Sequence, residues 1–284
     1  MTRKRYQWKL RTRDLQLGER TLIMAVINVT PDSFSDGGRY SDPDRAFARA
    51  IELEEAGADI VDIGAESTRP GSTRISEETE LHRLVPVLKR LRDQMAVPIS
   101  VDTYKSGVAK AALDYGVEII NDPSGHTLDP NLVRTAAQYG AGVVISHMRG
   151  TPDTWAKLPP MKDAMAVIVG DLGAAVHRAR HVGVDRSRIV VDPGLGFGKR
   201  KEQNLEILAR LPELAALDLP ILVGPSRKSF LKQTGEQETE IATAAAVTAA
   251  VLAGAHIVRV HAAREISIAA QLADAVLNSA RQED

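Results

Sequence analysis

Eight short runs of apolar, mostly β-branched residues recur along this chain of 284 residues. Runs without polar alternation are typical of strands buried on both faces, as in a parallel sheet. Longer segments rich in Ala, Leu, Glu and Arg lie between most of them and are expected to form helices. The expected strands are 22–28, 58–64, 98–102, 117–122, 141–147, 188–192, 220–224 and 256–261.

Glycine marks the ends of several expected helices. Gly57, Gly116, Gly140 and Gly254 each stand after a helical segment and just before a strand. Glycine is common there because it adopts the left-handed conformation that closes the last turn. The repeated unit of helix, glycine and strand favours an α/β fold with a single (β/α)8 TIM barrel, and a doubly wound open sheet is the alternative.

No linker divides the chain into separate domains. Residues 21–284 are expected to form the barrel. Residues 1–20 are a short N-terminal extension, either a hairpin that caps the barrel or an exposed hairpin. Long loops are expected at 151–160 and 232–240. The alanine-rich stretch 243–254 is too short to span a bilayer and is expected to be a buried helix.

Charge and composition exclude several classes of function. The chain has 36 basic and 37 acidic residues, so no overall field attracts nucleic acid or a membrane surface. Any anionic ligand must therefore be bound locally. The absence of cysteine excludes thiolate catalysis, disulfides and thiolate metal sites. The first twenty residues hold no apolar run long enough for a signal peptide, and a cytoplasmic protein is expected.

Polar residues stand at the C-terminal end of nearly every expected strand. In a β/α barrel these ends open on one face, where active sites are found. Any one of them taken alone would be a helix cap or turn residue, but their repetition predicts a site. They are Asn28, Glu66, Asp102, Asn121, Asp122, His147, Asp192, residues 226–228, Arg259 and His261.

Several of these segments carry chemistry that suits an anionic, flat ligand. Thr68 and Arg69 suit phosphate oxygens, although a solvated arginine is the alternative. The glycine-rich segment 192–199 lets the backbone approach a flat ligand, and it includes Phe197. Lys228 is a donor for a ring carbonyl or an anion.

Three further features of the sequence bear on anion and metal binding. Ser229 could bind a carboxylate. Arg259 and His261 alternate along one strand and point the same way, which suits an anion clamp. His177 and His181 have metal-ligand spacing on a helix, but no third ligand accompanies them, so a solvated face is expected.

The motifs taken together resemble the dihydropteroate synthases of the pterin-binding enzyme family. NVTPDSFSDGG, ESTRPG, SVDT, IIND, HMRGTP, DPGLGFGK, SRKSF and RVH occur in that family's order, from Asn28 to His261. These enzymes condense 6-hydroxymethyl-7,8-dihydropterin pyrophosphate with 4-aminobenzoate in folate biosynthesis. The products are 7,8-dihydropteroate and pyrophosphate.

The resemblance also implies roles for individual residues. The pterin slot would be lined by Asp102, Asn121, Asp192 and Lys228. Arg259 and His261 would hold the pyrophosphate, with Thr68 and Arg69 closing over it. The residues expected to be catalytic are Asp102, Asp192, Lys228, Arg259 and His261.

The second substrate and a metal ion complete the implied site. The 4-aminobenzoate would lie between Phe197, Pro70 and Phe34, with its carboxylate near Ser229. Asn28 would contact a Mg²⁺ ion bound with the pyrophosphate. Asp32 and Met148 are expected to contact substrate as well.

The implied chemistry needs little acid–base work. Pyrophosphate leaves the pterin methylene by C–O cleavage, and the arylamine nitrogen attacks the cation. Mg²⁺, Arg259 and His261 would stabilise the departing dianion. The family also implies a homodimer, here through the alanine-rich helix, and inhibition by sulfonamides.

The sequence departs from the family pattern at four positions, and two other functions are open. Ala65, Pro123, Ala242 and Ala262 replace usual residues, none of them an assigned contact. One alternative is the pterin domain of methyltetrahydrofolate methyltransferases, which needs no pyrophosphate clamp. The other is a catalytically silent paralogue that binds a pterin or a protein.

Overall fold

The eight expected strands form one parallel sheet. The computed structural model of the protein describes residues 3–30, 42–69 and 71–279. The strand order is β8-β7-β6-β5-β4-β3-β10-β9. The strands are β3 (Leu22–Asn28), β4 (Ile60–Gly64), β5 (Ile99–Asp102), β6 (Ile119–Asp122), β7 (Gly142–Ser146), β8 (Ile189–Asp192), β9 (Leu222–Val223) and β10 (Ile257–Val260).

The two edge strands of this sheet, β8 and β9, meet and close it into a barrel. A parallel bridge joins Val191 to Ile221, and the Val191 amide donates to the Pro220 carbonyl at 3.0 Å. The prediction of a (β/α)8 barrel is therefore confirmed. The alternative of an open doubly wound sheet is wrong, because an open sheet would leave β8 and β9 as free edges.

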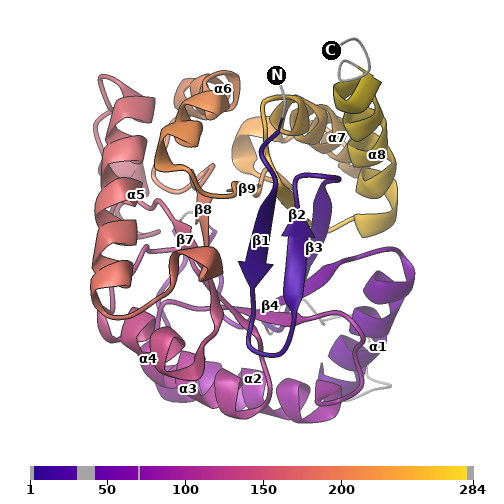
Figure 1. Ribbon diagram of the computed structural model, residues 1–284, viewed down its shortest axis with the longest axis vertical. Helices are drawn as coiled ribbons and strands as arrows, with labels where there is room; N and C mark the ends of the chain where they lie inside the picture. The colour runs from indigo at the N-terminus through magenta and orange to yellow at the C-terminus, as the bar shows by residue number, and fades with distance from the viewer. Residues whose placement is uncertain (1–2, 31–41, 70, 280–284) are drawn as a thin grey trace.

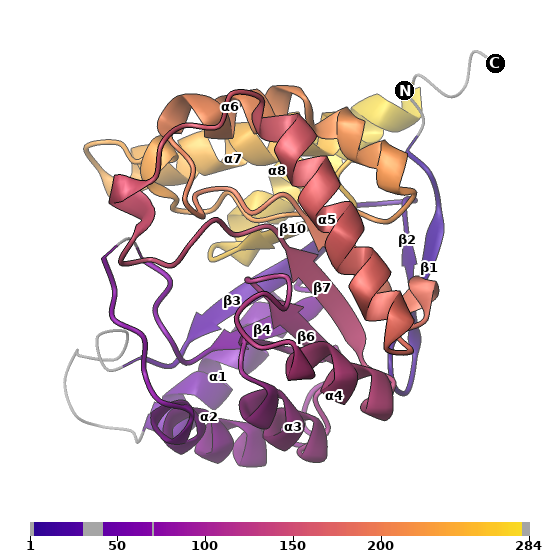
Figure 2. The ribbon, with the colours of Figure 1, turned by 90° about the vertical axis from the view of Figure 1, so that its left-hand side faces the viewer.

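Helices surround the barrel on its outside (Figures 1 and 2). The strands read as unbroken apolar runs because their outward side chains pack beneath these helices. The helices are α1 (Asp42–Glu55), α2 (Glu77–Leu91), α3 (Ser106–Asp114), α4 (Asn131–Tyr139), α5 (Ala164–His181), α6 (Lys201–Ala209), α7 (Glu236–Leu252) and α8 (Ala263–Ser279). Single or double 3-10 turns lie at η2 (Trp155–Lys157), η3 (Arg186–Arg188), η4 (Leu211–Leu217) and η5 (Ser229–Leu231).

The four helices expected to end at a glycine do so, with that glycine in the left-handed conformation. Gly57, Gly116, Gly140 and Gly254 all have positive φ.

The loop expected at 232–240 is half helical, because α7 begins at Glu236. Acidic residues in its first turn complement the helix dipole, and the Thr239 hydroxyl donates to the Gly235 carbonyl at 2.8 Å. Within the described ranges, no helix is both long and apolar enough to cross a membrane.

The N-terminal segment forms a hairpin across one end of the barrel (Figure 1). Strands β1 (Tyr6–Lys9) and β2 (Asp14–Leu17) pair antiparallel. Trp8 and Leu17 are fully buried against residues that start the barrel strands, including Met24 and Ile119. The hairpin fills the end of the barrel opposite the C-terminal ends of the strands, so these remain free to hold ligand (Figure 2).

Close packing holds this hairpin in place. The Trp8 indole donates to the Arg188 carbonyl at 2.9 Å. A Cβ on Gly142, the first residue of β7, would lie 2.5 Å from a Leu10 methyl and 3.2 Å from the Trp8 ring. Glycine is required there because the hairpin approaches the strand so closely.

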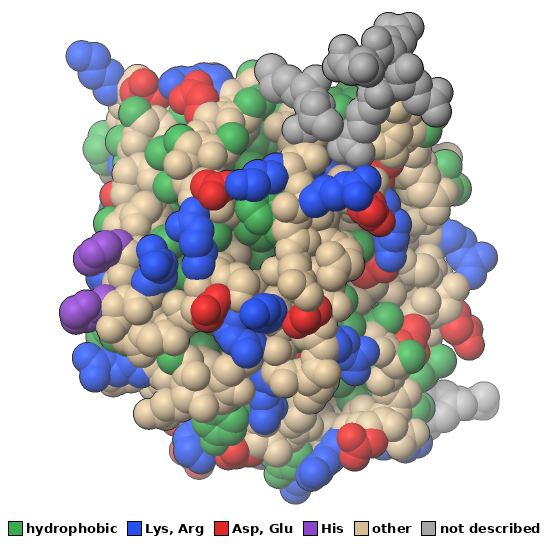
Figure 3. Space-filling view, in the orientation of Figure 1, with side chains coloured by type: hydrophobic (Ala, Val, Ile, Leu, Met, Phe, Trp, Pro, Cys, Tyr) green, Lys and Arg blue, Asp and Glu red, His purple; other side chains and the backbone are tan. Residues whose placement is uncertain are grey.

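The surface on the hairpin side of the barrel carries charges of both signs. On this face, Lys and Arg are interspersed with Asp and Glu, as the near-zero net charge leads one to expect (Figure 3).

Candidate active site

A cavity of about 760 Å³ opens at the C-terminal ends of the strands. Most of the polar residues predicted from the sequence meet there. The predicted residues that line it are Asn28, Glu66, Thr68, Arg69, Asp102, Ser226, Arg227, Lys228, Ser229, Arg259 and His261. They come from five different strands or the loops that follow them, so only barrel closure brings them together.

The floor of the cavity is an ion-pair network built around Arg259. Its Nε donates to Oδ2 of Asp62 at 2.7 Å, and its Nη2 donates to Oδ2 of Asp102 at 2.7 Å. The Asn121 amide also donates to Oδ2 of Asp62, at 3.2 Å. Asp62 is fully buried, and its Oδ1 has no hydrogen-bond partner among the described residues. The guanidinium thus neutralises two carboxylates that burial would otherwise penalise.

Burial shifts the protonation of the groups around this network. It raises the pKa of Asp102 to about 7, against the opposing charge of Arg259. It lowers the pKa of Lys228 to about 8, and Arg259 adds to this effect while Asp192 and Asp102 oppose it. Burial also raises the pKa of Asp192. The site therefore holds groups that change charge close to neutral pH.

The lowered pKa of His261 makes it a neutral hydrogen-bonding group of the expected anion clamp at pH 7. Burial lowers its pKa to about 3, and the charges of Arg259, Arg227 and Lys228 lower it further. Ser226 Oγ lies 3.0 Å from His261 Nδ1 and accepts from the His261 amide at 3.3 Å. In the tautomer where the Ser226 hydroxyl donates to Nδ1, the His261 ring keeps Nε2–H as a donor.

The glycine-rich segment after β8 is held by a buried lysine. Lys199 Nζ donates to the carbonyls of His147, Gly194 and Phe197, at 2.9, 2.7 and 3.2 Å. The Asp192 carboxylate accepts from the Gly194 amide at 2.7 Å. This segment therefore has a fixed shape, and the Lys199 ammonium donates to three main-chain carbonyls.

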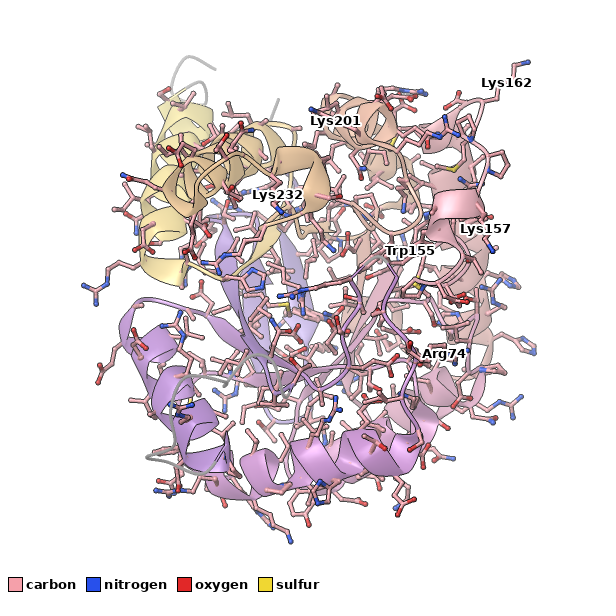
Figure 4. The ribbon with its side chains drawn as sticks, turned by 180° about the vertical axis from the view of Figure 1, so that it is seen from behind. Arg74, Trp155, Lys157, Lys162, Lys201 and Lys232 are labelled. Carbon is pink, nitrogen blue, oxygen red and sulfur yellow. The ribbon has the colours of Figure 1, made fainter. Side chains whose placement is uncertain are left out.

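The Lys228 side chain lies over the Phe197 ring. Lys228 Nζ lies 4.0 Å from the centre of that ring, a cation–π contact. Phe197 is only 7% exposed and lies beneath Lys228, while Trp155 packs beside it at 5.6 Å and lines the cavity. Figure 4 shows Trp155 on the same side of the barrel mouth as Arg74.

Some predicted residues lie away from the open cavity. Asn121 and Asp192 are buried beneath its lining, 4% and 6% exposed. Met148 lines a separate hollow of about 210 Å³ between the loop after β6 and α5, together with His147 and Asp171. Asp32, Phe34 and Pro70 lie outside the described residues.

Two other sequence features have structural explanations. The Asp122 carboxylate accepts from the Ser124 amide and hydroxyl, at 2.9 and 2.8 Å, so it closes the turn after β6. His177 and His181 are exposed on α5, as expected for a solvated face.

Sequence reasoning missed three residues of the site. Asp62 is the most important, and the available signal was a carboxylate in the middle of an otherwise apolar strand. Trp155 and Arg49 also line the cavity, but a loop and a helix carry them there without any local motif.

Comparison with known proteins gives the family. The model of the pterin binding enzymes matches residues 24–261. A dihydropteroate synthase from Synechocystis sp. is 42% identical over 263 residues, covering 91% of each chain. The chain belongs to the pterin-binding enzymes.

Solved structures of these pterin-binding enzymes share the whole fold. A dihydropteroate synthase from Clostridium difficile, solved in the presence of pteroic acid, has a TM-score of 0.86 and 41% identity, covering 92% of this chain and 98% of that one. One from Xanthomonas albilineans with 4-aminobenzoic acid has a TM-score of 0.88 and 37% identity, covering 96% and 98%. One from Yersinia pestis in a sulfonamide drug complex has a TM-score of 0.87 and 37% identity, covering 95% and 98%. Within the pterin-binding enzymes, the chain is thus a member of the dihydropteroate synthases.

Proposed function

We propose that the cavity condenses 6-hydroxymethyl-7,8-dihydropterin pyrophosphate with 4-aminobenzoate, releasing pyrophosphate and forming 7,8-dihydropteroate. The observation that carries this is the juxtaposition of buried carboxylates with buried cations on the floor of the cavity. Carboxylates match the donor edge of an aminopterin, whereas cations match a pyrophosphate. The relatives solved with pteroic acid and 4-aminobenzoic acid support the same pair of substrates.

The pterin slot is proposed at Asp102, Asn121, Asp192 and Lys228. The pKa of Asp102, about 7, lets its carboxyl accept or donate a hydrogen bond near neutral pH. Lys228 would donate to the ring carbonyl of the pterin. Ionised Asp102 and Asp192 would stabilise the positive charge that develops on the pterin as the C–O bond breaks.

The pyrophosphate is proposed to lie nearer the mouth, against Arg69, Thr68 and His261. Neutral His261 would contribute a hydrogen bond from Nε2, not a charge. Arg259 already pairs with Asp62 and Asp102. Its positive charge would therefore act on the pyrophosphate while partly offset by these two carboxylates. The departing oxygens would be stabilised by donors that are in place before reaction, so little reorganisation is needed.

Mg²⁺ is proposed at Asn28. No cluster of three or more acidic, histidine or cysteine residues suited to a metal occurs in the part of the chain that the structure describes. A single amide oxygen nevertheless fits Mg²⁺, which usually keeps several waters and takes most other ligands from substrate phosphates. The ion would supply charge neutralisation for the leaving pyrophosphate.

The 4-aminobenzoate is proposed to bind at the rim, with its carboxylate at Ser229. Phe197 would contribute to this binding indirectly, because its ring sets the position of Lys228 above it. The contacts expected from Pro70 and Phe34, and the one from Asp32, remain predictions. Met148 remains a predicted substrate contact. Because it lines the smaller hollow, the pterin would have to extend into that hollow to touch it. A sulfonamide is expected to compete with 4-aminobenzoate, in line with the Yersinia pestis complex.

A homodimer is proposed through α7, the alanine-rich helix for which the family resemblance implied this role, together with α8. Ile268, Leu272 and Val276 follow one another at intervals of four on α8 and are 66, 67 and 52% exposed. Ile241 and Leu252 on α7 are 63 and 40% exposed, and the two helices lie side by side (Figure 1). Apolar patches of this kind mark protein interfaces. Sedimentation should give a dimer at micromolar concentration and a monomer for Leu272→Glu, and a monomeric wild type would reject the proposal.

Two further assignments, of the domains and of the location, are proposals. Residues 1–20 are proposed as a cap on a single catalytic domain, 21–284. The cytoplasmic location also remains a proposal.

The deciding experiment measures pyrophosphate release from the pterin pyrophosphate with Mg²⁺, with and without 4-aminobenzoate. Release should depend on 4-aminobenzoate and fall about 100-fold or more in Lys228→Ala and Arg259→Ala, because each removes a preorganised charge. Exposed Lys232→Ala and Arg264→Ala are the matched controls and should retain activity. Tight pterin binding without release would instead indicate the silent paralogue or the methyltransferase relative.

A further inference from the structure

A second charged cluster lies beside the cavity, and none of the roles above uses it. It joins Glu66, in the loop after β4, to Glu80 of α2 and to Lys105, just before α3. Lys105 Nζ donates to Oε2 of Glu66 and to Oε2 of Glu80. The three side chains are nearly inaccessible, with 9, 1 and 12% exposed for Glu66, Glu80 and Lys105. Such burial is unusual for a surface ion pair and indicates a fixed arrangement.

The neighbour of Lys105 secures the other end of the same loop. The Tyr104 hydroxyl donates to Oε1 of Glu66 at 2.9 Å. The same hydroxyl accepts from Nε of Arg74 at 2.9 Å, and the Arg74 guanidinium lies 4.8 Å from the centre of the Tyr104 ring. Tyr104 and Lys105 thus hold Glu66 at one end of the loop after β4, and Tyr104 holds Arg74 at its other end.

The segment held in this way carries ligand-facing residues. Glu66, Ser67, Thr68 and Arg69 all line the cavity. The Ser72 hydroxyl donates to the Ser67 carbonyl at 2.7 Å, which ties the segment to itself. The Gly71 amide donates to the Pro152 carbonyl at 3.0 Å, which ties it to the loop that bears Trp155. A displacement of Glu66 would therefore be passed to Thr68 and Arg69.

The charge balance of the cluster makes Lys105 its critical member. One ammonium serves two buried carboxylates, and Oε1 of Glu80 has no hydrogen-bond partner among the described residues. Without Lys105, these carboxylates would face each other uncompensated, and Glu66 would move toward solvent. Arg74, by contrast, is exposed and bonds to Glu66 only through the Tyr104 hydroxyl, although its charge also acts on Glu66.

We propose that Lys105 is a positioning residue that, through Glu66, sets Thr68 and Arg69 for the phosphate-bearing part of the substrate. This inference rests on the proposed function, since it assumes that the segment meets the pyrophosphate. Loss of the cluster should weaken binding of the anion and leave the pterin slot intact, because Asp102, Asn121 and Asp192 are held by other contacts.

The test compares Lys105→Met and Lys105→Arg with Lys110→Met, an exposed lysine of α3 that pairs with Asp114. Calorimetry would measure binding of inorganic pyrophosphate with Mg²⁺ and, separately, of 6-hydroxymethylpterin, which lacks phosphate. Lys105→Met should lose roughly 10-fold or more in pyrophosphate affinity and in kcat/KM, because a misplacement of about 1 Å is costly. Pterin affinity should stay within about twofold, Lys105→Arg should recover part of the loss, and Lys110→Met should match wild type.

Equal loss of pterin and pyrophosphate binding in Lys105→Met, or unchanged pyrophosphate binding, would overturn the proposal. If Lys105→Met does not fold, Arg74→Leu releases the other end of the segment and leaves Lys105 paired with Glu66 and Glu80. It should show the same selective loss, and wild-type pyrophosphate affinity in that variant would likewise overturn the proposal. If wild type binds pyrophosphate but never releases it from the substrate, the proposed function fails while the binding comparison still decides the role of Lys105.

Discussion

Replacing Arg259 by alanine tests the ion-pair network on the floor of the cavity. The change leaves Asp62 and Asp102, each 2.7 Å from the guanidinium, without their cation inside the barrel. Breaking a buried pair in this way costs about 3–5 kcal/mol, because the remaining charge is uncompensated. Two carboxylates depend on Arg259, so we expect the upper part of that range and a melting temperature lower by roughly 10 °C.

The loss of stability should depend on pH. The pKa of Asp102 is about 7 with Arg259 present, and Arg259 opposes the burial that raises it, so the pKa rises further in the variant. A carboxyl with a raised folded-state pKa stabilises the fold at low pH, and that contribution is lost as pH rises through the folded-state value. The deficit of Arg259→Ala relative to wild type should therefore be smaller at pH 5 than at pH 8.

The assay is urea unfolding followed by circular dichroism at pH 5, 7 and 8. The double variant Arg259→Ala/Asp62→Asn should regain part of the stability, because an amide needs no counter-charge, but it should not regain pyrophosphate release. Exposed Arg264→Ala is the control and should unfold like wild type. A wild-type unfolding midpoint for Arg259→Ala, or a deficit independent of pH, would refute the reasoning.

Two other predictions concern the hairpin and its junction with the barrel. Trp8 is fully buried, so Trp8→Ala should cost about 3–5 kcal/mol in urea unfolding yet leave KM for both substrates unchanged, with exposed Gln7→Ala as control. A raised KM would contradict the placement of the hairpin at the far end of the barrel. His256 bonds the Lys4 carbonyl and the Ile221 amide, and burial lowers its pKa from 6.5 to about 4. Because the folded-state pKa of His256 is lowered, its contribution to the free energy of unfolding is complete above pH 6.5 and is lost as pH falls toward 4. In His256→Gln, the urea concentration at the unfolding midpoint should therefore vary less with pH between these two values. An unchanged pH profile in that variant would count against this assignment.

Much of the fold could be predicted because its signals are local. A strand buried on both faces needs a continuous apolar run, and a helix that turns back into a strand needs glycine at its end, so both leave marks in neighbouring residues. The start of α7 was missed because its first turn is polar and faces solvent. Closure of the barrel left no local signal, since it rests on Val191 meeting Ile221.

The candidate site divides in the same way. The sequence alone determined which residues end the parallel strands, and those ends must share one face, so Asn28, Asp102, Lys228 and Arg259 could be placed together. Their partners and charge states came only from the tertiary structure. Arg259 and Asp62 are 197 residues apart, and the neutral His261, the shared Lys105 and the Asp102 pKa near 7 each depend on burial and on charges from distant segments. Burial and long-range charge arise only when those segments pack, which is why the sequence indicated the residues of the site but not their electrostatics.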